Sequence, residues 1–99
     1  MKEYGSITID SNLYEARKHG QTLALTLREF ELLKYLAARE DKVCSREQLL
    51  EDVWNYEYHG DIRTVDVTVR RLREKLEEDS SSPEYLITKH GVGYYFHRS

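Results

Sequence analysis

The segment RTVDVTVRRLREKLE, residues 63–77, decides the fold because two periodicities compete in it. Valines alternate with polar residues through its first half, which is typical of a strand. Apolar residues also recur at helical spacing: Val65, Val69, Leu72 and Leu76. A strand of this length would be unusually long and would place Arg71 and Arg73 on the side of Val65. A helix gathers the apolar residues into one narrow stripe, so we predict an amphipathic helix.

Val67 falls on the opposite side of this helix from the apolar stripe. At about 100° per residue it lies about 200° from Val65, between Arg63, Arg70 and Arg71. One interpretation is an isolated exposed valine, which is common on protein surfaces. The other is a helix face built for the major groove of DNA, with arginines for guanine edges and phosphates and a compact apolar side chain for a thymine methyl. The geometry of the helix alone leaves both interpretations open.

The composition indicates one ordinary globular domain. The chain has 99 residues, of which 39% are hydrophobic and 33% charged, enough for one modest core but not for two. No apolar run approaches the roughly 18 to 20 residues of a membrane span, and the N-terminus lacks the pattern of a signal peptide. The single cysteine, Cys44, permits no internal disulfide, which is typical of a reducing compartment. We therefore expect one domain over residues 1–99, a cytoplasmic location and no membrane contact.

The charge is unevenly distributed along the chain. The net charge of −3 is not that of a typical nucleic-acid binder. Between Arg63 and Arg73, however, four arginines face only one acidic residue, Asp66. Acidic residues gather just beyond this segment: Glu77, Glu78, Asp79 and Glu84. This acidic cluster would repel phosphate, so we expect the N-terminal half of the helix to face any nucleic acid.

Strands are predicted near both ends of the chain. The alternating segments SITID (6–10) and TLALT (22–26) enclose LYEARK (13–18) and predict a small antiparallel sheet. Near the C-terminus, two short apolar segments, 85–89 and 94–97, flank the sequence HGVG, whose glycines permit a positive φ. The C-terminal pair therefore predicts a β-hairpin.

Two capping-box pairs mark the starts of two further helices. Thr26 is followed by Glu29, and the apolar residues after them hold helical spacing over residues 27–38. Ser45 and Gln48 form the second pair, ahead of a short amphipathic helix that ends near Trp54. With the strands, these helices predict a compact α+β domain.

Four segments taken together resemble a known family. RTVDVTVRRLREKLE with the hairpin LITKHGVGYYF, preceded by LTLREFELLKYLA and SREQLLEDVW, is similar to the effector domain of OmpR/PhoB-type response regulators, most closely the WalR (YycF) branch. The motifs RTVDV and GVGYYF at this separation are far more specific than either alone. The resemblance implies a winged helix-turn-helix, with a four-stranded N-terminal antiparallel sheet, three helices and a C-terminal β-hairpin wing. It also implies sequence-specific binding to double-stranded DNA by a transcriptional regulator of a two-component phosphorelay.

The resemblance also implies the residues that contact DNA. It places the third helix in the major groove and the wing at the adjacent minor groove. The expected contacts are Arg63, Thr64, Val67, Thr68, Arg70 and Arg71 on the helix, and Thr88, Lys89 and His90 on the wing. We expect Thr64 to hold phosphate, Val67 and Arg71 to read bases, and Arg63 and Arg70 to do both. Arg73 is expected to pair with neighbouring acidic residues.

The wing departs from the commoner family pattern at its turn. Many members carry an arginine just before the glycine, where this chain has Lys89 and His90. The lysine can still hold phosphate. For His90 two interpretations stay open, because histidine changes its charge near neutral pH. It either enters the minor groove, where nearby phosphate keeps it protonated, or only occupies the turn.

The family implies partners as well as DNA. A phosphorylatable receiver domain is expected upstream, with a sensor kinase acting on it and tandem dimers forming on DNA. Loop 55–61, longer than a simple helix-turn-helix needs, corresponds to the surface implicated in contacting RNA polymerase. Its tyrosines either fold back onto Trp54 or stay exposed as anchors for a partner. We hypothesise that Tyr58 is the partner contact and that Tyr56 is packed.

Other chemistry finds little support in the sequence. The glycines of HGVG lie in a hairpin and do not match a nucleotide-binding loop. The histidines and Cys44 lack metal-ligand spacing, and no nucleophile is paired with a base. We therefore expect no cofactor, no metal and no enzymatic activity. The alternative function is a winged-helix protein-interaction module without DNA binding, which the acidic net charge permits.

Overall fold

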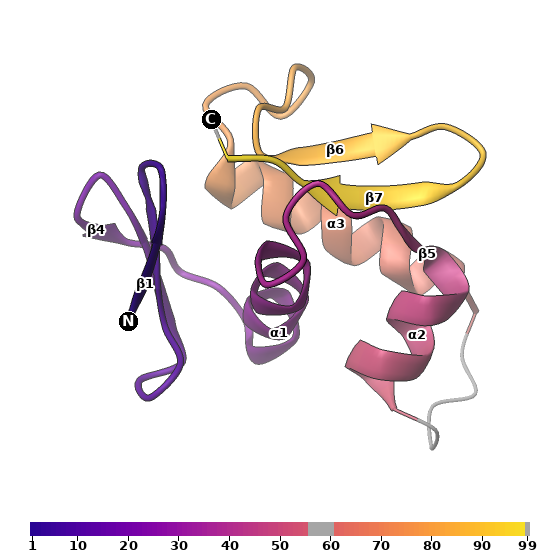
Figure 1. The fold of residues 1–99 in the computed structure, drawn as a ribbon, viewed down its shortest axis with the longest axis horizontal. Coiled ribbons are helices and arrows are strands. Elements are labelled where there is room, and N and C mark those ends of the chain that lie inside the picture. The colour runs from indigo at the N-terminus through magenta and orange to yellow at the C-terminus, as the bar shows by residue number, and fades with distance from the viewer. Residues whose placement is uncertain (56–60, 99) are drawn as a thin grey trace.

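The computed structural model describes residues 1–55 and 61–98, and its elements agree with the predicted α+β architecture (Figure 1). They are β1 (Lys2–Tyr4), β2 (Ile7–Asp10), β3 (Glu15–Lys18), β4 (Gln21–Thr22), α1 (Leu27–Ala37), β5 (Cys44–Ser45), α2 (Arg46–Trp54), α3 (Arg63–Leu76), β6 (Leu86–Lys89) and β7 (Gly93–Phe96). The four-stranded N-terminal sheet, the three helices and the C-terminal hairpin of a winged helix are confirmed. In the described part of the chain, no helix is long and apolar enough to cross a membrane.

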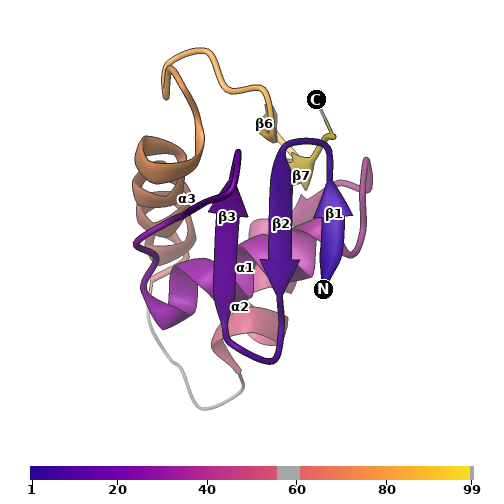
Figure 2. The same ribbon diagram turned by 90° about the vertical axis from the view of Figure 1, so that its left-hand side faces the viewer.

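The N-terminal sheet is an antiparallel meander in the order β1-β2-β3-β4. Figure 2 shows it standing in front of α1, against which it packs its apolar face, including Ile7, Ile9 and Ala16. The predicted strand 22–26 is wrong beyond Thr22, where β4 ends. Leu23 and Leu25 lie outside the strand but pack against the core, which explains their alternation with polar residues.

Helix α1 begins at the predicted capping box. The Thr26 hydroxyl accepts a hydrogen bond from the Glu29 backbone N–H at 3.1 Å, and the Glu29 carboxylate accepts one from the Thr26 N–H at 2.9 Å. Glu29 is buried and also accepts a bond from Lys75 of α3 at 2.6 Å. Burial raises the pKa of Glu29, but the bonds from Lys75 and Thr26 outweigh it and lower the pKa overall. The cap therefore also fixes α1 against α3.

Helix α2 forms only half of the predicted second capping box. The Ser45 hydroxyl accepts from the Gln48 N–H at 3.0 Å as expected. The Gln48 side chain does not return to Ser45, because its amide donates to the Tyr35 hydroxyl of α1 at 2.9 Å. The reciprocal bond of the box is thus replaced by a contact between α1 and α2. On its inner face, α2 buries Leu49, Val53 and Trp54.

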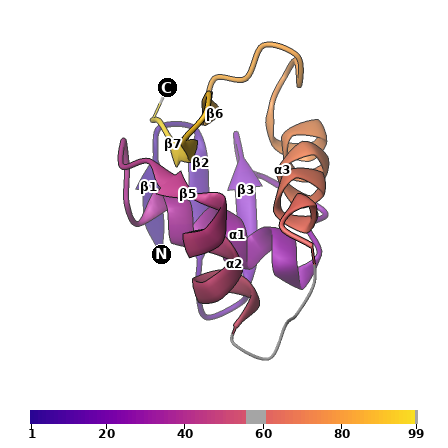
Figure 3. The same cartoon turned by 90° about the vertical axis from the view of Figure 1, so that its right-hand side faces the viewer.

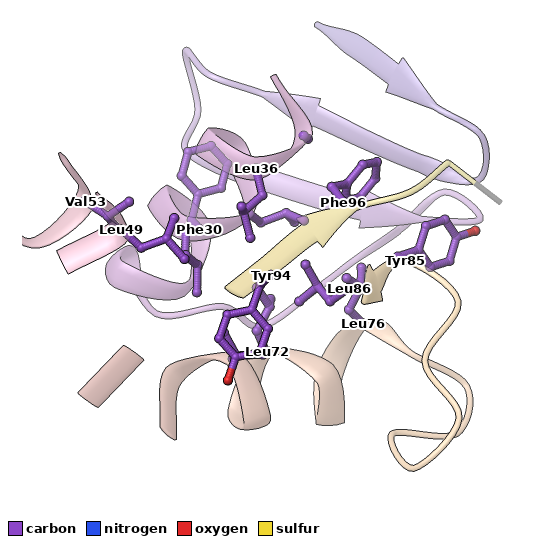
Figure 4. Close-up of a cluster of buried hydrophobic side chains, with 14 of the residues drawn as sticks. Phe30, Leu36, Leu49, Val53, Leu72, Leu76, Tyr85, Leu86, Tyr94 and Phe96 are labelled. Carbon is purple, nitrogen blue, oxygen red and sulfur yellow. The ribbon is translucent and has the colours of Figure 1, made fainter. Parts of the chain in front are cut away.

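Helix α3 resolves the competing periodicities of residues 63–77 in favour of a helix. Its apolar stripe is fully buried between α1 and the hairpin: Val65, Val69, Leu72 and Leu76. Figure 3 shows α3 along one side of the molecule, and Figure 4 shows Leu72 and Leu76 beside Leu86 in the core. Burying each such side chain contributes about 1.5–3 kcal/mol, which exceeds the few tenths that a β-branched residue costs in a helix. Packing therefore overrides the strand propensity of the valines.

The acidic cluster after α3 is smaller than the sequence predicts. Glu77 is buried, and its carboxylate accepts hydrogen bonds from the backbone N–H groups of Glu84, Tyr85 and Leu86 at 2.8–3.2 Å. The prediction that Glu77 is part of an acidic cluster that would repel phosphate is therefore wrong for this residue. The side chain closes the loop that leads into β6 and satisfies donors that would otherwise be buried without partners.

The C-terminal hairpin belongs to a second sheet, in the order β5-β7-β6. Strand β5, which the sequence pattern does not predict, pairs Cys44 with Tyr94 and Ser45 with Gly93. A Cβ atom at Gly93 would lie 2.0 Å from the Cys44 carbonyl oxygen, so this glycine is required by the close approach of β5. Only Gly91 of the HGVG pair has a positive φ, at +79°. The predicted conformational role holds for Gly91 and is wrong for Gly93.

The two glycines predict different costs of substitution. Gly93→Ala should lower the free energy of unfolding by about 1–3 kcal/mol, because β5 and β7 must separate to admit the methyl group. A methyl group at Gly91 would meet no atom within 4 Å. Gly91→Ala should therefore lower the free energy of unfolding only by the strain of its positive φ, about 1 kcal/mol. Urea denaturation of both variants measures this difference. An equal or larger loss in Gly91→Ala would contradict the packing role of Gly93.

Candidate nucleic-acid interface

The outer face of α3 carries the residues that the resemblance implies for DNA contact. Arg63, Val67, Arg70 and Arg71 are exposed there, and 46% of the Val67 surface remains accessible. Thr64 and Thr68 lie on the same helix and are half-buried. Four of the six predicted helix residues are therefore exposed on the side opposite the core, and the two threonines lie nearer its border.

The arginines of this face differ in their ion pairs. Among the residues that the structure describes, no carboxylate pairs with Arg70 or Arg71. Arg63 is held by Asp61, which accepts from its side-chain nitrogens at 2.7 and 3.0 Å and from its backbone N–H at 2.9 Å. These hydrogen bonds lower the pKa of Asp61. Arg70 and Arg71 are therefore available to an anion as they stand, whereas Arg63 must exchange a partner.

The two threonines present their polar atoms differently. The Thr68 hydroxyl donates to the Thr64 carbonyl at 2.9 Å within the helix. Its proton is therefore engaged inside the helix, and a phosphate oxygen, which only accepts, has to compete for it. Thr64 stands in the first turn of α3, where its N–H donates to the Asp61 carbonyl.

On the wing, the three predicted residues fall into two groups. Lys89 and His90 are exposed at the turn, which is closed by a hydrogen bond from the Val92 N–H to the Lys89 carbonyl at 2.9 Å. The Thr88 hydroxyl instead accepts from Arg73 of α3 at 2.7 Å. Lys89 and His90 are placed for contact with a ligand, and Thr88 links the wing to the helix.

Arg73 does not make the predicted pair with acidic residues. Its guanidinium donates to the Leu86 carbonyl at 2.8 and 3.0 Å and to Thr88, all on β6. Burial lowers the pKa of Arg73, and the electrostatic influence of Tyr94 and Glu77 only partly offsets this effect. The sequence signal for this role is its position on the helical wheel, about 80° from Val65 and thus at the border of the apolar stripe.

A second polar group, not predicted from the sequence, joins α2, α3 and the wing. The Asp66 carboxylate accepts from Arg46 of α2 at 2.8 Å and from the Tyr94 hydroxyl of β7 at 2.6 Å. Burial, together with the bond to Asp66, raises the pKa of Tyr94 to about 12. A hollow of about 330 Å³ opens beside this group, between the start of α2 and the wing turn.

The arrangement forms a cationic surface on a chain of net charge −3. The one carboxylate within α3 near this surface, Asp66, is already paired, so it offers little repulsion to phosphate. Tyr56 and Tyr58, of the loop that the sequence predicts to contact a partner, lie outside the described residues. Among the described residues, no group of histidine, cysteine or acidic side chains could hold a metal ion. The exposed arginines of α3 suit a polyanion.

Comparisons with known proteins agree with this geometry. A family model described as "Transcriptional regulatory protein, C terminal" matches residues 20–96. The response regulator DrrB of Thermotoga maritima, an OmpR/PhoB homologue, is 36% identical with a TM-score of 0.90, and the alignment covers 97% of this chain and 43% of DrrB. The chain therefore spans less than half of that relative.

Isolated DNA-binding domains match over almost their whole length. The RstA DNA-binding domain of Klebsiella pneumoniae, solved in complex with the RstA box, is 32% identical with a TM-score of 0.89, covering 99% of this chain and 97% of that one. The DNA-binding domain of CpxR from E. coli is 31% identical with a TM-score of 0.81 and has the same coverage. By the family match and these similarities, the chain belongs to the family of transcriptional regulatory protein C-terminal domains, with the winged-helix fold of the OmpR/PhoB type.

Proposed function

We propose that the chain binds double-stranded DNA sequence-specifically, as the effector domain of a two-component response regulator that controls transcription. The observation that carries this proposal is the outer face of α3, where Arg70 and Arg71 stand without carboxylate partners among the described residues and flank the exposed Val67. Such a face matches the major groove, where arginine reads guanine and a small apolar group meets the thymine methyl. The complex of the similar RstA domain with its DNA box supports the same use of the fold.

Each side chain then has a definite role on the duplex. The N-terminal half of α3 enters the major groove, because the exposed Glu78 and Asp79 beyond its C-terminus would be repelled by phosphate. Arg71 forms two hydrogen bonds to a guanine edge, and Val67 contacts a base at the same depth. Thr64 in the first turn anchors a phosphate, and Arg63 exchanges Asp61 for phosphate or a base.

The wing supplies the second contact. Lys89 and His90 are both exposed at the turn. Lys89 holds phosphate, and His90 either enters the adjacent minor groove in its protonated form or only occupies the turn. Thr88 contributes by fixing β6 to α3 through Arg73. Phosphate contacts of this kind give affinity and register, and the contacts of α3 give sequence preference.

The wider setting of the domain is part of the proposal. In the full-length regulator a receiver domain precedes residue 1, a sensor kinase phosphorylates it, and the effector domains bind DNA as tandem dimers in the cytoplasm. The lengths of the relatives support this, since DrrB is a response regulator of which the chain covers 43%. Within the family, we propose that the chain is nearest the WalR (YycF) branch, on the resemblance of the four segments quoted above.

The salt dependence of duplex binding tests the function itself. We expect the dissociation constant for a duplex selected from a random pool to rise steeply between 50 and 200 mM salt, by about 10-fold or more for each few phosphates contacted. Fluorescence anisotropy at several salt concentrations gives this slope. Binding that is absent, or that does not change with salt, would favour the alternative of a protein-interaction module.

A comparison of two variants tests the division of roles along α3. Arg71→Ala should remove about 1–3 kcal/mol of discrimination at one base pair, whereas Thr64→Ala should weaken all sequences by a similar factor. Arg98→Ala, which removes the same charge from a guanidinium paired with Glu40, serves as the matched control. Selection profiles of the three variants decide the assignment. Equal loss of specific and random binding in Arg71→Ala would show that Arg71 does not read a base.

The proposed contact with RNA polymerase rests on the family resemblance of loop 55–61. We expect Tyr58→Ala in the full-length regulator to reduce promoter output while duplex affinity and melting temperature stay unchanged. Tyr56→Ala serves as the comparison and should lower stability by about 1 kcal/mol or more if its ring is packed. Promoter output, duplex binding and melting are measured on both variants. A parallel loss of binding and output in Tyr58→Ala would mean that the loop only supports the recognition helix.

A further inference from the structure

Asp66 is an acidic residue in α3, the helix that we propose contacts DNA, where a negative charge is unexpected. Asp66 lies one turn into α3, beside the arginines, where an unpaired carboxylate would repel phosphate. It is instead bonded on both oxygens: Arg46 donates to Oδ2 at 2.8 Å, and the Tyr94 hydroxyl donates to Oδ1 at 2.6 Å. These two donors come from α2 and β7, so one carboxylate joins three elements.

Tyr94 connects the wing to α3 through this contact. Only 9% of the residue is exposed, and Figure 4 shows its ring reaching from β7 toward α3 with the hydroxyl at the helix. The pKa of about 12 keeps the hydroxyl protonated throughout the neutral range, so it remains a donor to Asp66. The contact is therefore a hydrogen bond to a carboxylate, which is among the stronger kinds in proteins.

A second attachment of the wing lies two turns further along the helix. Arg73 follows Asp66 by seven residues, close to two turns, and so projects from the same side of α3. Its guanidinium bonds to Leu86 and Thr88 of β6 and lies 5.6 Å from the centroid of the Tyr94 ring. Figure 1 shows the hairpin running alongside α3, as two attachment points along the helix would require.

The bond between Asp66 and Arg46 attaches the start of α2 to α3. Arg46 is the first residue of α2, directly after Ser45, which pairs with Gly93 of the hairpin. The start of α2, the middle of β7 and the first half of α3 therefore meet at one carboxylate. A shift of the wing relative to α3 has to break a bond of Asp66 or of Arg73.

We propose that Asp66 is a positioning residue for DNA recognition: it holds the wing turn at a fixed place relative to the outer face of α3, so that both contact one duplex together. The inference rests on the proposed function. In this proposal Asp66 does not itself contact DNA. Without its bond to Tyr94, the wing keeps its bonds to Arg73, its pairing with β5 and its apolar contacts, but it loses the polar attachment at the first half of α3.

The experiment compares binding to two duplexes. The first is a duplex selected by the parent domain from a random pool, and the second is the same duplex shortened stepwise until the contact of the wing is lost but that of α3 is kept. Tyr94→Phe removes only the hydroxyl that bonds to Asp66. Tyr95→Phe, on the same strand, removes a hydroxyl with no hydrogen-bond partner among the described residues and is the matched control.

We expect Tyr94→Phe to weaken binding to the long duplex about tenfold, which is the loss of affinity that one missing hydrogen bond to a charged group produces. Binding to the short duplex should not change. Tyr95→Phe should change neither. Asp66→Asn should show the same selective loss, and the Asp66→Asn/Tyr94→Phe double variant should lose little more than either alone. A role limited to stability would lower the melting temperature without distinguishing the two duplexes.

Three outcomes overturn the inference. Equal weakening on both duplexes would show no specific role in placing the wing, and unchanged binding in Tyr94→Phe would show that the bond does not matter. Tighter binding of Asp66→Asn to both duplexes would identify Asp66 as a repelling charge. If the parent domain binds no duplex with salt-dependent affinity, the proposed function itself has failed, which is a separate result.

Discussion

The burial of one face of α3 is the interaction on which the rest of the structure depends. Val65, Val69, Leu72 and Leu76 fill the space between α1 and the hairpin. Because a helix has a fixed period, burying this stripe determines which residues point outward. The arginines around Val67 are therefore presented to solvent by the same packing that stabilises the core. The core and the candidate interface are two sides of one helix.

Polar contacts determine where the neighbours of α3 sit. At its C-terminal end, the Leu76 carbonyl accepts from Lys18 of the N-terminal sheet at 2.8 Å, and Lys75 bonds to Glu29 of α1. The hairpin is bound by Asp66 in the first half of α3 and by Arg73 in the second half. Apolar burial has little directional preference, whereas these bonds fix distances and orientations. Side-chain hydrogen bonds, together with the pairing of β5 and β7, thus help to set the position of the wing relative to α3.

The parts of this structure that follow from local sequence were predictable, and those that depend on distant partners were not. The period of the apolar residues predicts α3, and Thr26 with Glu29 predicts the start of α1. The role of Glu77 depends on backbone groups seven to nine residues away, and that of Arg73 on β6, so neither is visible in periodicity or charge. The outer face of α3 was predictable because it is defined by exclusion from the core.

The central claim is that α3 and the wing contact one duplex at the same time. The most direct measurement is a titration of the ¹⁵N-labelled domain with a selected duplex, followed by backbone amide chemical shifts. We expect the largest changes in two separate groups, one over the first three turns of α3 and one at residues 89–91, that progress together with a single dissociation constant. Changes confined to one group, or centred on the N-terminal sheet, would contradict the account.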